Sequence, residues 1–355
     1  MTWPKTSIIW LNYNSSRIMP IVLESLESIV NLDYPSDRYE LIVVDNGSTD
    51  GSFEKIKEFL ERENSLRKRI IKLNHNLGFT GGNNLGFTVR DKESKYVLLL
   101  NNDAVLFQGS LKTLVEYAEN YDTVAGLQGV VLKYKSRHID TAGSYISELL
   151  GSYLLGRGHE YPWILKKPVY VTYPDGSCML YRVESIVRSL GNKLFIDEFF
   201  GYGDDNVLGL MMWNHGYKLI AIPEAVASHA RGLTFGRGKR SALTVYLGER
   251  NRIALSLITN TRYKHIIPLY TLRNTVTTIL TTRFKSSTSA IARALFDGIK
   301  LGRKLKSRGI IIDIYKAPII KIPVKDLGVF FTTKHVVAEY FKDWALKNLN
   351  SLFVE

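Results

Sequence analysis

Hydrophobic residues in the first 130 positions follow two alternating patterns. Short apolar runs, typical of strands buried on both faces, occupy 7–11, 41–44, 70–73 and 96–100. Between these runs, apolar residues recur every three or four positions, which predicts helices with one buried face at 17–30, 53–60, 82–90 and 111–118. Alternating strands and helices predict an α/β fold with a mostly parallel central sheet flanked by helices.

The rest of the chain divides into a mixed segment and a helical one. The mixed segment has a predicted helix at 207–214 and predicted strands at 124–133, 169–173, 177–181 and 218–222. From 241 onward the apolar spacing is helical. Residues 230–355 hold 23 Lys and Arg against 7 Asp and Glu, whereas residues 1–229 hold 24 against 27. We therefore predict one α/β domain over 1–240 and a basic helical appendage over 241–355.

Composition narrows the class of protein. The 355 residues are 45% hydrophobic, which is enough for a large folded core. Cys178 is the only cysteine, so an internal disulfide cannot form and a reducing compartment, the cytoplasm, is expected. The first apolar run, 8–11, is shorter than the core of a signal peptide. The sequence has no run of about 18 apolar residues, so no membrane-spanning helix is predicted.

Candidate ligand-binding residues directly follow the buried strands. Asp103 comes after Leu98–Leu100 with Asn101 and Asn102 beside it, at the carboxyl end of a strand, where open α/β sheets bind ligands. A carboxylate without Cys or His nearby suits Mg²⁺ or Mn²⁺ that also holds phosphate oxygens. Asp45 also ends a strand; it can accept an N–H of uracil, thymine or guanine, or cap the next helix. Together the two segments indicate a nucleotide-sugar site.

A glycine-rich segment, 74–86, follows the third predicted strand. Its small residues either let backbone N–H groups approach a phosphate at a helix N-terminus or form an ordinary turn. The segment is not G-x-G-x-x-G, and the chain contains no G-x-x-x-x-G-K-[ST]. These absences argue against a dinucleotide-binding protein and a P-loop protein.

Two further segments carry titratable residues. Asp204 and Asp205 lie at a Gly-flanked helix start, where one carboxylate can cap the helix and the other can face a cleft as a general base. His229 follows the predicted strand at 218–222 and is either structural or a metal ligand through its neutral imidazole.

In this order, the motifs resemble those of family 2 glycosyltransferases with the GT-A fold, especially rhamnosyltransferase-like enzymes, over roughly residues 4–258. Residues 76–84, NLGFTGGNN, resemble the N-x-G-F-[AS]-x-G-x-N stretch of that family. Residues 195–205 resemble its F-D-E-x-F-F-x-Y-G-E-D block. Three more segments resemble its nucleotide-binding, metal-binding and acceptor-side motifs: 43–52, 101–103 and 176–182.

The resemblance implies an inverting transfer of a sugar from a UDP-, dTDP- or GDP-linked donor to a hydroxyl of a glycan or polyprenol-linked acceptor. It makes Asp205 the general base, with an ordinary pKa near ~4, and Asp103 and His229 the ligands of Mg²⁺ or Mn²⁺. The implied donor-binding residues are Asp45, Asn76, Gly78, Gly81, Asn83, Asn101 and Asn102. The implied acceptor or cleft residues are Asp204, Gly176 and Tyr202.

The chain departs from the family pattern at two places. Val207 stands where the family has a third acid, which affects the expected acceptor cleft. The metal motif has one carboxylate where the family has two, so substrate diphosphate is expected to supply most of the metal ligands.

The basic region allows two interpretations. Apolar residues at helical spacing between 266 and 280, and again between 291 and 299, are accompanied by a cluster of basic residues: Lys300, Arg303, Lys304, Lys306 and Arg308. Such helices suit an anionic membrane surface, at the inner face of the cell membrane. They equally suit packing on the catalytic domain, with Lys and Arg in solvent.

Two other functions and an inactive relative compete with glycosyl transfer. The inactive relative would share the fold and only bind nucleotide, and the joint presence of Asp45, Asp103 and Asp205 argues against it. A sugar nucleotidyltransferase should carry a Gly-rich loop with Arg or Lys after the first strand, where this chain has Asn12–Ser15. A nucleic-acid-binding protein would account for the net charge of +13. That charge, however, lies outside the motif-rich part, and the chain has no zinc or RNP-type signature. We therefore expect no nucleic-acid partner.

Overall fold

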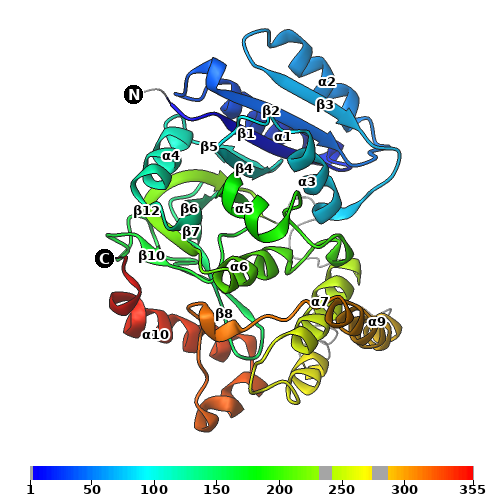
Figure 1. Cartoon of the computed structure of the whole chain (residues 1–355), viewed down its shortest axis with the longest axis vertical. Coiled ribbons are helices and arrows are strands. Elements are labelled where there is room, and N and C mark those ends of the chain that lie inside the picture. Colours follow the sequence, from blue (N-terminus) through cyan, green and yellow to red (C-terminus); the bar gives the residue numbers. More distant parts are fainter. Residues whose placement is uncertain (1–2, 232–241, 274–286, 355) are drawn as a thin grey trace.

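The computed structural model describes residues 3–231, 242–273 and 287–354. Figure 1 shows a mixed α/β domain around one central sheet, with the C-terminal helices gathered at the opposite end of the molecule from α2 and β3. The predicted fold class and the C-terminal helical appendage are confirmed. Part of the apolar stripe predicted between 266 and 280 lies outside the described residues.

The first half of the sheet is parallel. β1 (Thr6–Asn12) lies between β2 (Tyr39–Asp45) and β4 (Tyr96–Asn101), and β3 (Lys68–Lys72) pairs with the outer edge of β2. Residues of β1 pair in step with both neighbours, so Asn12 lies beside Asp45, and Leu11 beside Asn101. The carboxyl ends of three strands are therefore at one edge of the sheet.

The second half of the sheet is mixed. β11 (Cys178–Arg182) runs antiparallel between β4 and β6 (Val124–Lys133). β12 (Lys218–His229) pairs in parallel with β6, and its far end meets the short β5 (Ala104–Leu106). The sheet is completed by β10 (Val169–Tyr170) and β7 (Ile139–Thr141). A separate hairpin joins β8 (Ser144–Ile146) and β9 (Ser152–Leu154). The short strands β5, β7, β8 and β9 were not predicted, because they have too few residues for a periodic pattern.

Alternate residues of each central strand pack on opposite faces of the sheet. Leu98 and Leu100 belong to a core that includes α1 (Met19–Val30) and α4 (Ser110–Asn120). Val97 and Leu99 belong to a second core with Phe87 of α3 (Gly78–Val89). Both faces are covered, which explains why the strands are continuous apolar runs. All four helices and all four strands predicted in the first 130 residues are confirmed, with α2 at Ser52–Arg62.

The helices of the second half carry and surround the candidate base. α5 (Val183–Leu190) follows β11, and α6 (Asp204–Asn214) follows a short 3-10 turn at Asp197–Phe199. α7 (Ala242–Ile258) packs against α9 (Ser287–Ser307). α10 (Lys334–Leu352) lies against the hairpin, where Trp344 meets Tyr145 with ring centroids 5.0 Å apart. None of the described helices combines the length and the apolar character needed to cross a bilayer.

Two helical glycines test whether packing or helix propensity decides stability. A methyl group added at Gly209 of α6 would lie 2.4 Å from Cβ of Tyr173 and 2.5 Å from the carbonyl oxygen of Thr172. We expect Gly209→Ala to lower the free energy of unfolding by about 1–3 kcal/mol through overpacking, although alanine is the better helix former.

Gly248 of α7 is the matched control, because a methyl group there meets nothing within 4 Å. Gly248→Ala should raise the free energy of unfolding by up to about 1 kcal/mol. Urea denaturation of both variants measures the difference. Shifts of the same sign and size would show that packing around Gly209 does not decide the outcome.

Candidate active site

The amide of Asn12 connects the ends of the parallel strands. Its Nδ2 donates to Oδ1 of Asp45 at 2.8 Å and lies 3.2 Å from the hydroxyl of Ser48. Its Oδ1 accepts from Nδ2 of Asn102 at 3.2 Å and from the hydroxyl of Ser15 at 2.5 Å. One side chain thus joins the ends of β1, β2 and β4.

Asp45 lies entirely inside this network. Its carboxylate is fully buried; one oxygen accepts from Asn12 and the other from the backbone N–H of Ser48 at 3.0 Å. This arrangement holds the loop after β2 together. A contact between Asp45 and a nucleobase stays a prediction, and it requires the fully buried carboxylate to become accessible to the nucleobase.

The glycine-rich segment forms the start of α3 and the turn before it. Asn76 accepts from Nδ2 of Asn46 at 2.9 Å and from the N–H of Gly78 at 2.7 Å. Gly78 has φ +76°, and a Cβ there would lie 2.3 Å from the carbonyl oxygen of Phe200. Only glycine allows this approach, which brings the predicted donor segment against the loop that carries the predicted base.

Two other residues of this segment are engaged within the fold. Gly81 lies against the side chain of Leu77: a Cβ at Gly81 would be 2.7 Å from Cβ of Leu77. Asn83 is buried and donates to the carbonyl of Phe79 at 2.8 Å. The donor-binding roles of these residues stay predictions.

Asn84, the last Asn of the stretch 76–84 but not one of the predicted donor-binding residues, connects α3 to the segment before the base. Its Oδ1 accepts from the N–H groups of Leu194 and Phe195, both at 2.9 Å. Its Nδ2 donates to the carboxylate of Asp197 at 2.6 Å. The signal was present in the run of two Asn residues, but the sequence cannot show which segment they bond.

Asp205 lies at the start of α6, opposite the turn before β11. Its Oδ2 is 3.4 Å from the backbone nitrogen of Gly176, and its Oδ1 accepts from the N–H of Asn206 at 2.9 Å. A Cβ at Gly176 would lie 3.5 Å from the ring of Phe79 and 3.8 Å from Oδ2 of Asp205. The predicted base and the donor segment thus meet beside Gly176.

The environment of Asp205 changes its expected chemistry. Burial, together with the negative charges of Asp204 and Asp175, raises the pKa of Asp205 well above its ordinary value. Burial and the charge of Asp175 raise the pKa of Asp204 to about 6. The ordinary pKa expected for Asp205 from the sequence is therefore wrong, because the sequence does not show how deeply the two carboxylates are buried.

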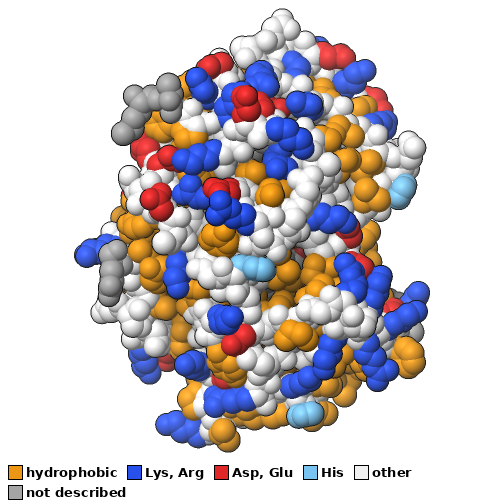
Figure 2. All heavy atoms as spheres, in the orientation of Figure 1, with side chains coloured by type: hydrophobic (Ala, Val, Ile, Leu, Met, Phe, Trp, Pro, Cys, Tyr) orange, Lys and Arg blue, Asp and Glu red, His pale blue; other side chains and the backbone are white. Residues whose placement is uncertain are grey.

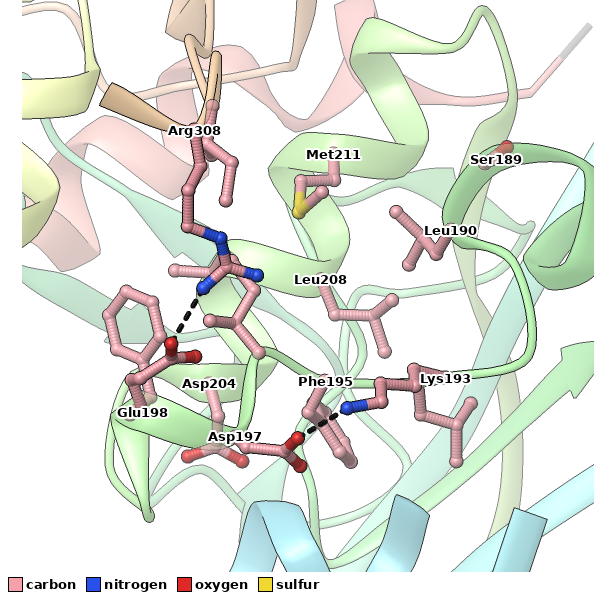
Figure 3. Close-up of a pocket in the computed structure, with 15 residues that line it drawn as sticks. Ser189, Leu190, Lys193, Phe195, Asp197, Glu198, Asp204, Leu208, Met211 and Arg308 are labelled. Atoms are coloured by element: carbon pink, nitrogen blue, oxygen red, sulfur yellow. Dashed lines mark hydrogen bonds and ion pairs between the residues drawn. The ribbon is translucent and has the colours of Figure 1, made fainter. Parts of the chain in front are cut away.

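The two adjacent carboxylates face different surroundings. Asp204 lines a pocket of about 290 Å³ behind the base-bearing loop, between α5, α6 and the end of α9 (Figure 3). The pocket is mostly apolar, and two ion pairs lie beside it: Lys193 with Asp197, and Arg308 with Glu198. Val207, which replaces the expected third acid, also lines this pocket. Tyr202 is 40% exposed, and its hydroxyl lies 3.2 Å from that of Thr244 in α7.

Beside Asp103, buried charges alternate in sign. Nε2 of His229 lies 3.0 Å from Oδ1 of Asp103, and its Nδ1 lies 3.1 Å from Oδ2 of Asp140. Arg231 donates to Asp140 and to Asp175, both at 2.7 Å. Four of these five residues are buried, whereas the Arg231 side chain is 32% exposed; we call the five the buried charge row. Asp103 and His229, predicted as metal ligands, are thus brought together, and the sequence missed the other three.

The buried charge row holds its members in their charged forms. Burial lowers the pKa of His229, but Asp103 and Asp140 together outweigh it and raise that pKa to about 9. Burial acts against ionisation of Asp140 as well, yet His229 and Arg231 lower its pKa to about 2. The pKa values of Asp103 and Asp175 are likewise lowered by their cationic neighbours despite burial.

The side chains near Asp103 limit how a metal ion could be held. Within the part of the chain that the structure describes, no three His, Cys, Asp or Glu side chains are grouped as ligands of one ion. Asp103 fits Mg²⁺ or Mn²⁺ that takes its other ligands from phosphate oxygens. His229 fits less well, because ligation requires loss of a proton and of a carboxylate partner. Its role as a ligand stays a prediction.

The three predicted functional carboxylates are brought to one edge of the sheet. Asp45 is joined through Asn12 to Asn102, the neighbour of Asp103. The Asn101 N–H donates to the carbonyl of Ser177 at 3.1 Å, and Ser177 follows Gly176, which faces Asp205. Segments far apart in the sequence therefore meet at a single site.

Comparison with known proteins identifies the family. The model of "Glycosyl transferase family 2" matches residues 7–188, more than half of the chain. The chain belongs to this family. Membership favours glycosyl transfer over the nucleotidyltransferase and the nucleic-acid-binding protein. The resemblance to rhamnosyltransferase-like members stays a prediction.

Curated relatives are distant and longer than the matched segment. A Methanococcus voltae dolichyl N-acetyl-alpha-D-glucosaminyl phosphate 3-beta-D-2,3-diacetamido-2,3-dideoxy-beta-D-glucuronosyltransferase is 22% identical over 63% of this chain and 66% of its own length. An uncharacterised glycosyltransferase of Nostoc is 28% identical over 52% of each protein. This family 2 chain thus spans between about half and two thirds of the length of these relatives.

Solved structures share the fold at low identity. The mannosyltransferase PcManGT of Pyrobaculum calidifontis, in complex with GDP-Man and Mn²⁺, is 18% identical, with a TM-score of 0.54 over 87% of this chain and 83% of its own. Staphylococcus aureus TarS 1–349, in complex with UDP-GlcNAc, is 17% identical, with a TM-score of 0.53 over 86% and 84%. These likenesses support the GT-A fold.

Asp140 offers a test of the buried charge row. Because its carboxylate helps to raise the pKa of His229 to about 9, Asp140→Asn should lower that pKa. Because folding raises the pKa of His229, protonated His229 stabilises the folded state fully below about pH 6.5. This stabilisation is lost as the pH rises through about 9. In the variant the loss should begin at lower pH.

The measurement is an NMR titration of the His229 imidazole nitrogens in metal-free protein, with denaturation curves at each pH. Asp313→Asn, a change at an aspartate outside the buried charge row, serves as the control. An unaltered titration midpoint in Asp140→Asn would remove Asp140 from this role.

Proposed function

We propose that this chain is an inverting glycosyltransferase that moves a sugar from a nucleotide diphosphate-sugar to a hydroxyl of a glycan or lipid-linked acceptor. The observation that carries the proposal is the meeting of three segments at Gly176. The carboxylate of Asp205 faces its N–H, Phe79 of the glycine-rich segment lies beside it, and the next residue bonds to Asn101. Donor-binding and base-bearing segments are thus within reach of one substrate.

In the proposed site the donor lies along the carboxyl ends of β1, β2 and β4. The loops that follow Asp45 and precede Gly78 hold the nucleotide, and Asn101 or Asn102 bonds the ribose. TarS and PcManGT were solved with UDP-GlcNAc and GDP-Man, which supports a UDP- or GDP-linked donor here; a dTDP-linked donor fits the same carboxylate chemistry. The acceptor approaches from the side of Gly176 and Tyr202; the acceptor role of Asp204 stays a prediction, because the pocket that Asp204 lines includes neither of these residues.

Asp103 would hold Mg²⁺ or Mn²⁺ against the donor diphosphate, with His229 as a second ligand if it gives up its proton. Such an ion offsets the negative charge that develops on the leaving group. PcManGT was solved with Mn²⁺, which supports a metal in this position. The single carboxylate is consistent with a site in which the substrate supplies most of the oxygen ligands.

The chain's own contribution to the reaction is the base. Ionised Asp205 takes the proton of an acceptor hydroxyl while that oxygen attacks the anomeric carbon on the face opposite the diphosphate. Attack from the opposite face inverts the configuration. Burial and the charges of Asp204 and Asp175 raise the pKa of Asp205, which makes its ionised form a stronger base.

Replacing the base tests this mechanism directly. Asp205→Asn should lower turnover by at least ~10²-fold, because general-base catalysis contributes typically 10²–10⁴ in rate. Donor affinity should hardly change. The measurement is nucleoside diphosphate release and thermal shift with a panel of UDP-, dTDP- and GDP-sugars, with Mg²⁺ or Mn²⁺.

Asp197→Asn is a matched control, since Asp197 is a carboxylate of the same block that bonds Asn84 and Lys193 instead of facing Gly176. In the wild type, activity should fall on acidification with an apparent pKa well above ~4. Near-normal turnover of Asp205→Asn would refute its role as the base.

The proposal also places the chain in the cytoplasm, attached peripherally to the inner face of the membrane. One face of α9, which we call the α9 outer face, is exposed and consists of Arg293, Phe296, Ile299, Lys300 and Arg303. Phe296 is 78% exposed, with basic residues one turn before and after it. Figure 2 shows Lys and Arg side chains gathered over the part of the molecule where Figure 1 places α7 and α9.

The exposed ring and cations of the α9 outer face suit contact with an anionic bilayer better than packing on the catalytic domain. The opposite face of α9 is already packed on α7, where a Cβ at Gly298 would lie 2.6 Å from the carbonyl oxygen of Arg250. An apolar ring between cations can enter the lipid headgroups while the cations bind phosphates. Each basic residue near an anionic surface contributes about 1 kcal/mol. A lipid-linked acceptor would be reached from such a position.

Vesicle flotation tests the α9 outer face. The double variant Phe296→Ser/Lys300→Glu should bind vesicles that contain anionic phosphatidylglycerol several-fold more weakly than the wild type, at roughly 0.1 M salt. Leu346→Ser is the control, because Leu346 is a 52% exposed apolar residue on α10.

Wild-type protein that does not float with anionic vesicles would refute membrane attachment. Equal binding by the double variant would move the contact away from α9. A salt-dependent shift with RNA or DNA in place of vesicle binding would favour a nucleic-acid partner instead.

A further inference from the structure

The loop that carries the proposed base has an unfavourable backbone. Phe200 has φ +65° and Tyr202 has φ +67°, both in the left-handed region, and Gly203 follows with φ +85°. A non-glycine residue adopts such angles only where its surroundings impose them. Asp204 and Asp205 follow at once, so the position of the base depends on whatever holds this loop.

Asn251 of α7 holds the loop from one side. Its Nδ2 lies within hydrogen-bonding distance of three backbone carbonyl oxygens: Phe199 at 3.0 Å, Gly201 at 2.8 Å and Tyr202 at 2.7 Å. The side chain is 2% exposed, so water does not compete for these carbonyls. Two N–H groups thus serve three acceptors that surround both left-handed residues.

Arg250, the preceding residue, orients this amide. Its Nε donates to Oδ1 of Asn251 at 2.9 Å, and its terminal nitrogen donates to the carbonyls of Glu198 and Phe199 at 2.9 and 2.7 Å. An arginine only donates, so the oxygen of the Asn251 amide must face it and the nitrogen must face the loop. The orientation of the amide is therefore fixed by chemistry.

The glycine-rich segment holds the same loop from the other side. The N–H of Thr80 lies 3.4 Å from the carbonyl oxygen of Phe200, and its hydroxyl donates to the carbonyl of Asp197 at 3.1 Å. Gly78 lies directly against Phe200. The α3 side contributes donor-binding residues, whereas the α7 side carries no residue with a proposed catalytic or binding role.

We infer that Asn251, oriented by Arg250, is a positioning residue that holds the 198–203 loop in the conformation that directs Asp205 at the acceptor hydroxyl. This inference rests on the proposed function. In the interactions described, the Asn251 side chain bonds only to Arg250 and to the 198–203 loop. Its effect on the reaction therefore passes through that loop. Asn251 lies in the basic region after 241, outside the catalytic domain that the sequence predicts.

Kinetics of four variants test the inference. Asn251→Ala should lower kcat by roughly 10- to 100-fold, the range expected for displacing a catalytic group by about 1 Å. Donor affinity should stay within about threefold, since the donor loops lie on the other side. Asn251→Asp should be as impaired, because a carboxylate has no N–H for the three carbonyls. Arg250→Lys, which loses the Nε–H that orients Asn251, should be intermediate.

Asn214→Ala controls for a general loss of stability. Asn214 also donates to two backbone carbonyls, of Leu210 and Asp313, but at the far end of α6. This variant should lower Tm and leave kcat unchanged. A kcat of wild-type size in folded Asn251→Ala, or an equal fall in Asn214→Ala, would overturn the inference.

Failure of this inference can be told apart from failure of the proposed function. If Asp205→Asn keeps normal turnover, the base assignment fails whatever Asn251 does. If Asp205→Asn is inactive and Asn251→Ala is fully active, only the positioning role fails. Should Asn251→Ala not fold, Arg250→Lys decides, because normal kcat in that variant would overturn the inference alone.

Discussion

Three carboxylates and two cations alternate through the buried charge row, from Asp103 through His229, Asp140 and Arg231 to Asp175. Each cation lies between two carboxylates at about hydrogen-bonding distance. The three carboxylates and His229 are buried, and buried charges are tolerated only when each is paired, because the desolvation of an unpaired charge is too unfavourable. The alternation satisfies this requirement and leaves one net negative charge.

The same row fixes the distances within the site. Asp103 lies in the turn between β4 and β5, His229 ends β12 and Asp140 lies in β7, so their ion pairs hold these segments together. Asp175 also accepts from the hydroxyl of Ser177 at 2.6 Å and so anchors the turn that contains Gly176. The predicted metal carboxylate and the N–H that faces Asp205 are therefore held by one continuous set of bonds.

Base and donor segments share a second support, the 198–203 loop. α3 contacts it on one face and α7 on the other, and its carbonyls are the acceptors in both cases. The division at 240, drawn from charge and composition, stays a prediction, and contacts cross it. α9 extends this arrangement: Lys304 and Arg308 pair with Glu198 of the loop, whereas the α9 outer face points to solvent.

The sequence by itself determined the alternating strands and helices, because a sheet covered on both faces needs continuous apolar runs and helices need a 3.6-residue repeat. It also located Asp45, Asp103 and Asp205, since polar residues that end buried strands or begin helices stand out locally. Only the tertiary structure showed that Asp140, Asp175 and Asn251 lie against the candidate site. Their bonds to His229, to Arg231 and to carbonyls of the 198–203 loop join positions that are 49 to 91 residues apart, and no local pattern records such a pairing. The raised pKa of Asp205 has the same origin, because burial and the charge of Asp175 exist only once distant segments have packed together.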